Sequence, residues 1–203
     1  MALLLGSGWL VIRQSQGKRH GIAIPLLLIP ALVFGWFEYQ DRRAVQVMSH
    51  AASMLAHRSV SVVCQRASGA FVDAGSELGS VQFDENGNPF DYTDLKYDAC
   101  TNLRAWMGSD KRNPTLDQVI AVHVLAHESE HLAGEMSESV AECNSVQTTA
   151  RTAELLGASP EQAAALAQAY VTLVYPRMPD NYVSADCTPG GKLDRHPEDP
   201  AWP

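Results

Sequence analysis

The stretch from Val122 to Cys143 constrains the fold of this chain more than any other. It contains His127 and His131 in the pattern H-E-x-x-H. Side chains four residues apart lie on one face of an α-helix, about one turn apart, so both imidazoles can reach the same cation. Glu128 directly follows the first histidine, where its carboxylate can take a proton from a nearby water. The pattern therefore predicts a helix that combines two metal ligands with a general base.

A third ligand is expected downstream of His131, because a catalytic zinc ion usually has three protein ligands and one open position. Gly134 predicts the end of the helix. Glu138 and Glu142 share a face of the next predicted helix, and a chain that turns at Gly134 can bring this face back against the first helix. On the residues alone, Glu138, Glu142 and Glu135 are all candidates.

The segment from Glu138 to Glu142 reads E-S-V-A-E. Together with the upstream motif it resembles the zincins, a group of zinc metalloproteases, and especially the small gluzincins, in which H-E-x-x-H is followed by E-x-x-x-D or E-x-x-A-D. The resemblance implies one zinc ion per chain, held by His127, His131 and Glu138. It also implies that Glu128 is the general base of peptide-bond hydrolysis, and that Glu142 orients a ligand histidine in place of the family's aspartate.

The metzincin pattern H-E-x-x-H-x-x-G-x-x-H is a second comparison. Gly134 matches it, but Ser137 stands where the third histidine would be. A neutral hydroxyl is a poor zinc ligand, so Glu138 is preferred. The resemblance is limited to about residues 115–157. His123, one turn before the motif, is expected to pack beside the site, with competition for the metal as the alternative.

Residues 21–37 form a mostly apolar run without charges, at the lower limit for a membrane-spanning helix. Lys18 and Arg19 precede it, which favours a cytoplasmic N-terminus and an exported remainder. No A-x-A-like cleavage site follows closely. We therefore expect an uncleaved membrane anchor over residues 1–43 and an exported domain over residues 44–203, with secretion after signal cleavage as the alternative.

Charge divides the chain in the same way. Residues 1–43 carry a net charge of +3 and residues 44–203 a net charge of −11. An acidic domain argues against a nucleic-acid partner. The expected partners are a peptide or protein substrate and, through the N-terminal segment, a membrane.

The four cysteines all follow the apolar run. An even number of cysteines in an exported domain predicts two disulfides, whereas free buried thiols would be expected in a cytoplasmic protein. Of the three pairings, Cys64–Cys100 and Cys143–Cys187 is preferred, because each bond links neighbours in the sequence. The second bond would tie the C-terminal tail to the helix that carries Glu138.

Hydrophobic patterns over the rest of the domain predict an α+β fold, mostly helical, with a small β-sheet. The resemblance makes this a zincin-like domain. Strands are expected at residues 59–65 and 79–83, with a turn at residues 86–89. Helices are expected over residues 40–58, within residues 92–107, from an N-cap at Asn113 to about Ala133, over residues 137–156, and from an N-cap at Ser159 to about Tyr175.

The tail, residues 176–203, is rich in Pro, Gly and Asp. Tyr182, Arg195 and His196 are its candidates for chemistry, since zincins often use Tyr, His or Arg to stabilise an oxyanion. The alternative is a loop that packs over the domain and is held by Cys187.

These features together predict a membrane-anchored zinc peptidase that faces outward. One alternative is a non-catalytic exported domain in which the same residues hold a structural metal or form a degenerate zincin site used for binding. Another is a helical interaction protein without a metal.

Overall fold

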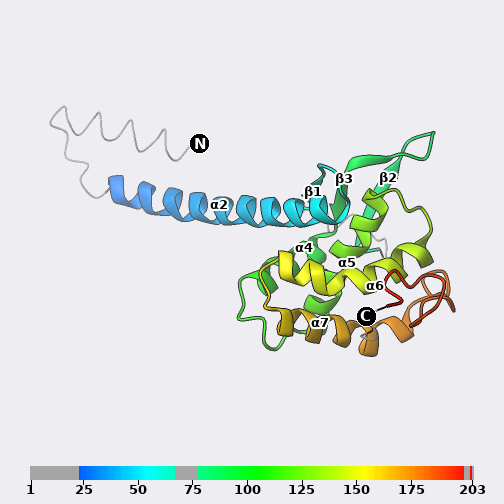
Figure 1. Cartoon of the computed structure of the whole chain (residues 1–203). Helices are drawn as coiled ribbons and strands as arrows, with labels where there is room; N and C mark the ends of the chain where they lie inside the picture. Colours follow the sequence, from blue (N-terminus) through cyan, green and yellow to red (C-terminus); the bar gives the residue numbers. More distant parts are fainter. Residues whose placement is uncertain (1–22, 67–76, 199–201, 203) are drawn as a thin grey trace. The chain divides into compact units, whose positions relative to one another are not determined.

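The computed structural model describes residues 23–66, 77–198 and 202 of the chain, and the side chains of residues 23–28 are outside this description. The chain divides into two units, Met1–Arg43 and Ala44–Pro203. Helix α2, Ala23–Leu55, contains the described residues of the first unit and the first residues of the second (Figure 1).

The predicted membrane-spanning segment begins at residue 21, outside the described residues. In the part of the chain that the structure describes, no helix is long and apolar enough to cross a membrane. The prediction of a spanning helix over residues 21–37 is therefore not confirmed.

The second unit has an α+β fold. Its sheet, as far as the described residues show, consists of β1 (Ser61–Cys64), β2 (Gly79–Phe83) and β3 (Pro89–Leu95) in the order β1-β3-β2. Strand β1 pairs with β3 in parallel, and β2 pairs with β3 in antiparallel orientation. The sequence predicted β1 and β2 but missed β3. The proline at its start and its two aspartates are depleted in strands, and the tertiary pairing outweighs this preference.

After the sheet, the described residues form four helices and a short 3₁₀ helix. They are α4 (Tyr97–Met107), α5 (Leu116–Leu132), α6 (Glu138–Leu155), α7 (Pro160–Leu173) and η1 (Tyr175–Arg177). Helix α5 is central: it contacts strands β2 and β3 as well as helices α4, α6 and α7 (Figure 1). Twelve of its 17 residues are buried, including both histidines of the motif. Its buried polar side chains therefore require specific partners.

Helix α5 begins two residues later than predicted. Its N-cap is Thr115, whose hydroxyl accepts a hydrogen bond from the backbone N–H of Gln118, while the Gln118 side chain accepts one from the N–H of Thr115. This capping box satisfies two backbone donors at once, which explains why the start predicted at Asn113 is wrong. The helix ends at Leu132 with Ala133 as its C-cap, directly before Gly134 with φ of 108°. The left-handed glycine turns the chain into α6, as predicted.

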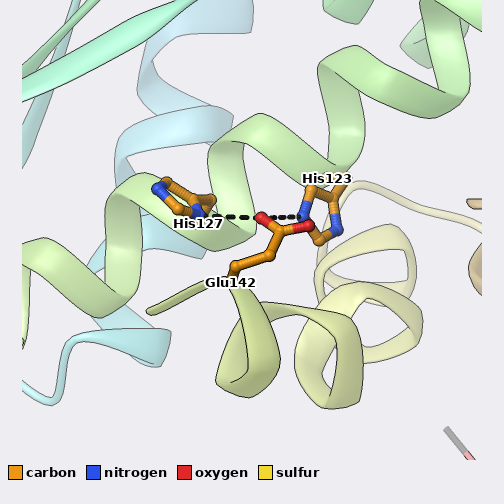
Figure 2. A group of neighbouring side chains, drawn as sticks. All are labelled: His123, His127 and Glu142. Carbon is orange, nitrogen blue, oxygen red and sulfur yellow. Dashed lines mark hydrogen bonds and ion pairs between the residues drawn. The ribbon is translucent and has the colours of Figure 1, made fainter. Parts of the chain in front are cut away.

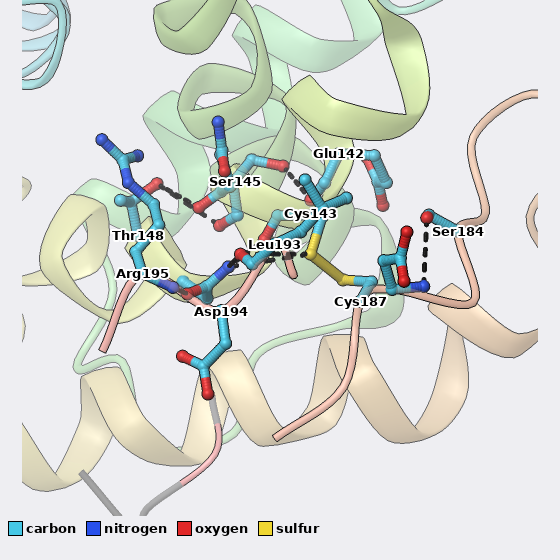
Figure 3. Close-up of a disulfide and its surroundings, with 12 residues drawn as sticks. Glu142, Cys143, Ser145, Thr148, Ser184, Cys187, Leu193, Asp194 and Arg195 are labelled. Carbon is cyan, nitrogen blue, oxygen red and sulfur yellow. Dashed lines mark hydrogen bonds between the residues drawn. A yellow bond between two sulfur atoms is a disulfide. The ribbon is translucent and has the colours of Figure 1, made fainter. Parts of the chain in front are cut away.

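The predicted capping box at Ser159 and Gln162 is confirmed at the start of α7. The preferred disulfide pairing is also confirmed: Cys64 bonds to Cys100, and Cys143 bonds to Cys187. The first bond joins β1 to α4. The second joins α6 to the tail (Figure 3).

Candidate metal centre

Three side chains from α5 and α6 converge on one point. The Nε2 atom of His127 lies 3.0 Å from Nε2 of His131 and 3.1 Å from Oε2 of Glu138. The Nε2 atom of His131 lies 3.4 Å from the same oxygen. Within the described residues, these three form one of two groups whose ligand atoms are close enough to hold one metal ion.

The triangle formed by these three atoms is compatible in size with a bound zinc ion. Bonds of about 2.0–2.1 Å in tetrahedral geometry separate two ligand atoms by about 3.3 Å. The observed separations run from 3.0 to 3.4 Å. Two imidazoles and one carboxylate are also a donor set of catalytic zinc sites. The donor types and the spacing of His127, His131 and Glu138 both fit zinc.

The second group is formed by His123, His127 and Glu142 (Figure 2). The Oε2 atom of Glu142 lies 3.0 Å from Nε2 of His123 and 3.0 Å from Nδ1 of His127. The hydroxyl of Tyr170 donates to Oε1 at 2.6 Å. Burial alone would raise the pKa of Glu142, but these three partners outweigh it and hold that pKa well below its usual range. The members of this group, like those of the first, are hydrogen-bonded to one another.

Hydrogen bonds on the far side of each ligand histidine fix its tautomer. An ionised carboxylate only accepts, so the Nδ1 atom of His127 that faces Glu142 carries the hydrogen. The Nδ1 atom of His131 lies 2.6 Å from the backbone oxygen of Glu135 and donates to it. With Nδ1 protonated on both rings, Nε2 is the atom of each ring that can bind a cation at the point shared with Glu138.

The carboxylates on either side of His127 favour a proton on its ring. Burial disfavours the charged form of His127, but hydrogen bonds with Glu138 and Glu142 outweigh burial and raise its pKa to about 9. The hydrogen bond with His127 in turn lowers the pKa of Glu138. At neutral pH, binding of a metal ion would displace this proton.

Glu128 lies beside the triangle and is 4% exposed. Burial raises the pKa of its carboxyl group to about 7. Its Oε2 atom lies 3.5 Å from the hydroxyl of Thr93 on β3, and its side chain covers the backbone of Gly79 on β2. A carboxyl group with a pKa near neutrality can both accept and return a proton.

A cavity of about 630 Å³ opens beside these residues. One part of the cavity is lined by His127, Glu128, His131 and Glu138. Strand β2 lines a second part, and the tail lines a third. Its apolar lining includes Leu78, Val81, Phe83, Ile120, Val124, Met136 and Val174. A concave apolar surface with a few convergent polar groups is typical of a substrate site.

Of the three tail candidates, Tyr182 lines the cavity, and its ring centre lies 5.7 Å from that of His127. Arg195 instead pairs with the buried carboxylate of Glu130, at 3.1 and 3.2 Å. His196 is exposed and lies 3.8 Å from Glu198. Of the three tail residues predicted as candidates for chemistry, only Tyr182 lines the cavity.

The tail is fastened to α6 next to Glu142. The disulfide Cys143–Cys187 is one attachment, and Leu193 and Arg195 lie along the same helix (Figure 3). The side chain of Gln147 donates to the carbonyl of Leu193 at 2.9 Å and accepts from the N–H of Arg195 at 2.8 Å. These bonds attach the tail to α6, and the attached tail includes Tyr182, which lines the cavity.

Sequence reasoning did not identify two residues of this site, Gly79 and Tyr170. Gly79 gives no signal in the sequence, because its role depends on the approach of β2 to α5. Tyr170 lies on the same helix face as the buried Ala163, Leu166 and Ala167. A tyrosine at such a position requires a partner for its hydroxyl, and this rule could have identified it.

No known family model, curated protein or solved structure matches this chain.

Proposed function

We propose that this protein is a zinc-dependent peptidase that holds one zinc ion with His127, His131 and Glu138. The observation that supports this most strongly is the coincidence of three features. The ligand atoms form a triangle compatible in size with a bound zinc ion, the triangle borders an apolar cavity, and the buried carboxyl group of Glu128 lies beside it.

When bound, zinc would act as a Lewis acid that polarises a carbonyl group and lowers the pKa of a bound water. The protein supplies the remaining functions. Glu142 and the backbone carbonyl of Glu135 hold the two ligand rings in orientation. Glu128 accepts a proton from the attacking water and returns it to the leaving amine. Tyr182, whose pKa is raised by burial to about 12, keeps its proton and donates a hydrogen bond to the developing oxyanion.

An extended peptide is the substrate that the cavity fits best. Strand β2 is at the edge of the sheet among the described strands, and Gly79, Val81 and Phe83 of this strand line the cavity. The backbone groups of an edge strand can pair with a peptide that adds as a further strand. The apolar lining then accommodates side chains of that peptide.

The two disulfides support a location outside the cytoplasm, because such bonds form and persist in oxidising compartments.

The test uses the full chain, purified with its disulfides intact. Elemental analysis is expected to find about one zinc per chain, which His131→Ala and Glu138→Ala should lose. Glu128→Gln should keep the zinc and lose peptide hydrolysis by about 10²-fold or more.

Full hydrolysis by Glu128→Gln would contradict the proposed base. Zinc retained by Glu138→Ala would contradict the proposed third ligand. A wild-type chain that binds zinc and cleaves no peptide in a broad library would favour a non-catalytic metal-binding domain instead.

A further inference from the structure

The carboxylate of Glu142 joins three helices. It extends from α6 and meets His123 of α5 and Tyr170 of α7, and the exposed fractions of these side chains are 2% or less. Neither His123 nor Tyr170 is one of the three proposed zinc ligands. Both nevertheless contact the group that orients His127.

The hydrogen bonds to Glu142 distinguish its two oxygen atoms. Tyr170 donates to Oε1 at 2.6 Å. His123 Nε2 donates to Oε2 at 3.0 Å, and the same oxygen accepts from Nδ1 of His127 at 3.0 Å (Figure 2). Rotation of the carboxylate would break at least one of these bonds. Its orientation is thus held from the side opposite the metal triangle.

The ring of His123 is itself held in place. It stacks on the ring of Tyr170, with centroids 3.4 Å apart and planes inclined by 11°. Its Nδ1 atom lies 2.8 Å from the hydroxyl oxygen of Thr149. A neutral ring that donates from Nε2 carries no hydrogen on Nδ1, so Nδ1 accepts from the hydroxyl of Thr149.

We propose that His123 and Tyr170 are positioning residues of the metal centre. They hold Glu142 so that His127 keeps its hydrogen on Nδ1 and presents Nε2 to the cation. This inference rests on the proposed zinc site and extends it to a second layer of residues. Groups that orient a ligand histidine typically change metal affinity about 10–100-fold when they are removed. Loss of the Tyr170 hydroxyl is expected to weaken zinc binding by about tenfold.

The test measures zinc affinity in the full chain by competition with a chromophoric chelator. Tyr170→Phe removes the hydroxyl and keeps the ring that stacks on His123. Tyr92→Phe is the matched control, because it removes a tyrosine hydroxyl from β3, outside the cavity lining. Measurements are made at a temperature at which circular dichroism shows every variant folded. Tyr170→Phe should bind zinc about tenfold more weakly, and Tyr92→Phe should bind it as the wild type does.

A purely structural role for Tyr170 predicts a different pattern, in which the midpoint of unfolding falls and the zinc affinity of the folded protein does not change. Nitrogen-15 NMR of the zinc-bound protein provides a second readout. The wild type should show His127 with its hydrogen on Nδ1, and Tyr170→Phe should show a mixed or exchanging signal. Wild-type affinity and an unchanged His127 signal in Tyr170→Phe would overturn the inference.

A further variant covers the case in which Tyr170→Phe does not fold. Thr149→Val removes the hydroxyl that donates to His123 Nδ1, and a few-fold weaker zinc affinity is expected. Wild-type affinity in Thr149→Val would then overturn the inference. His131→Ala distinguishes this failure from failure of the zinc site. If His131→Ala still binds zinc as the wild type does, the proposed function and the inference both fall. If it loses zinc while Tyr170→Phe and Thr149→Val bind normally, the inference alone falls.

Discussion

Gly79 of strand β2 lies directly against the carboxylate of Glu128 on helix α5. A Cβ atom built on Gly79 would lie 2.6 Å from Oε1 of Glu128, a distance that real Cβ contacts do not show. The absence of a side chain at position 79 therefore provides the space that the proposed base occupies. It also connects the edge strand of the sheet to the chemistry of the adjacent helix.

Gly79→Ala should consequently impair hydrolysis while preserving zinc binding. The new methyl group displaces the Glu128 carboxylate, and a shift of about 1 Å in a catalytic group can cost about 10²-fold in rate. Peptidase activity and zinc content of the purified variant are the measurements. Gly108→Ala is the matched control, because the nearest atom to a Cβ there is 3.5 Å away. Equal activity in the two variants would contradict the role assigned to Gly79.

Zinc affinity should rise with pH. The pKa of His127 in the metal-free protein is about 9, raised by Glu138 and Glu142 against the effect of burial. Below this pH, zinc must displace a proton from the ring, so affinity should increase by about tenfold per pH unit and level off near pH 9. Competition titrations from pH 6.5 to 9.5, corrected for the protonation of the chelator, measure this. An affinity that does not change over this range would contradict the raised pKa of His127.

Zinc should also stabilise the fold. A ligand that binds the native state alone, at 1,000 times its dissociation constant, adds about 4 kcal/mol to the free energy of unfolding. For a domain of this size, that corresponds to an increase in Tm of about 10 °C. Thermal unfolding followed by circular dichroism, with zinc and with chelator, tests the expectation. The same shift in His131→Ala would show that zinc acts elsewhere.

Tyr182→Phe should reduce kcat with little change in zinc affinity. The ring of Tyr182 remains to line the cavity, whereas the hydroxyl proposed to stabilise the oxyanion is lost. Removal of one such donor typically costs about 10²-fold in rate. Steady-state kinetics on a peptide substrate measure the effect, with Tyr97→Phe on α4 as the control. Unchanged kcat would exclude Tyr182 as the donor.

The two disulfides should differ in their effect on activity and agree in their effect on stability. They close loops of similar length, with sequence separations of 36 and 44, so the loss of either should cost about 4 kcal/mol. The double variant Cys143→Ser, Cys187→Ser also frees the tail segment that carries Tyr182, and KM should rise. The double variant Cys64→Ser, Cys100→Ser keeps the Cys143–Cys187 bond, so the tail segment with Tyr182 stays attached to α6. Equal KM values, measured where both variants are folded, would contradict this prediction.

Much of the fold could be predicted because it depends on local patterns. The helical repeat brings His127 and His131 within 3.0 Å of each other at Nε2, and any helix with this spacing has its histidines on one face. Gly134 and the Ser159–Gln162 pair mark helix ends through backbone conformation and capping. Strand β3 was missed because its formation depends on pairing with both neighbouring strands, not on its own residues.

The sequence by itself determined that His127 and His131 share one face of a helix and that Glu128 follows the first of them, because this depends on spacing within one element. The tertiary structure decided which carboxylate faces the two histidines, because that depends on the packing of α6 against α5. It directs Glu138 to Nε2 of His127 and Glu142 to Nδ1. It also decided the roles of Gly79 and Tyr170, which act on residues 49 and 28 positions away in the chain. Contacts across such separations arise from packing between elements, and no local pattern encodes them.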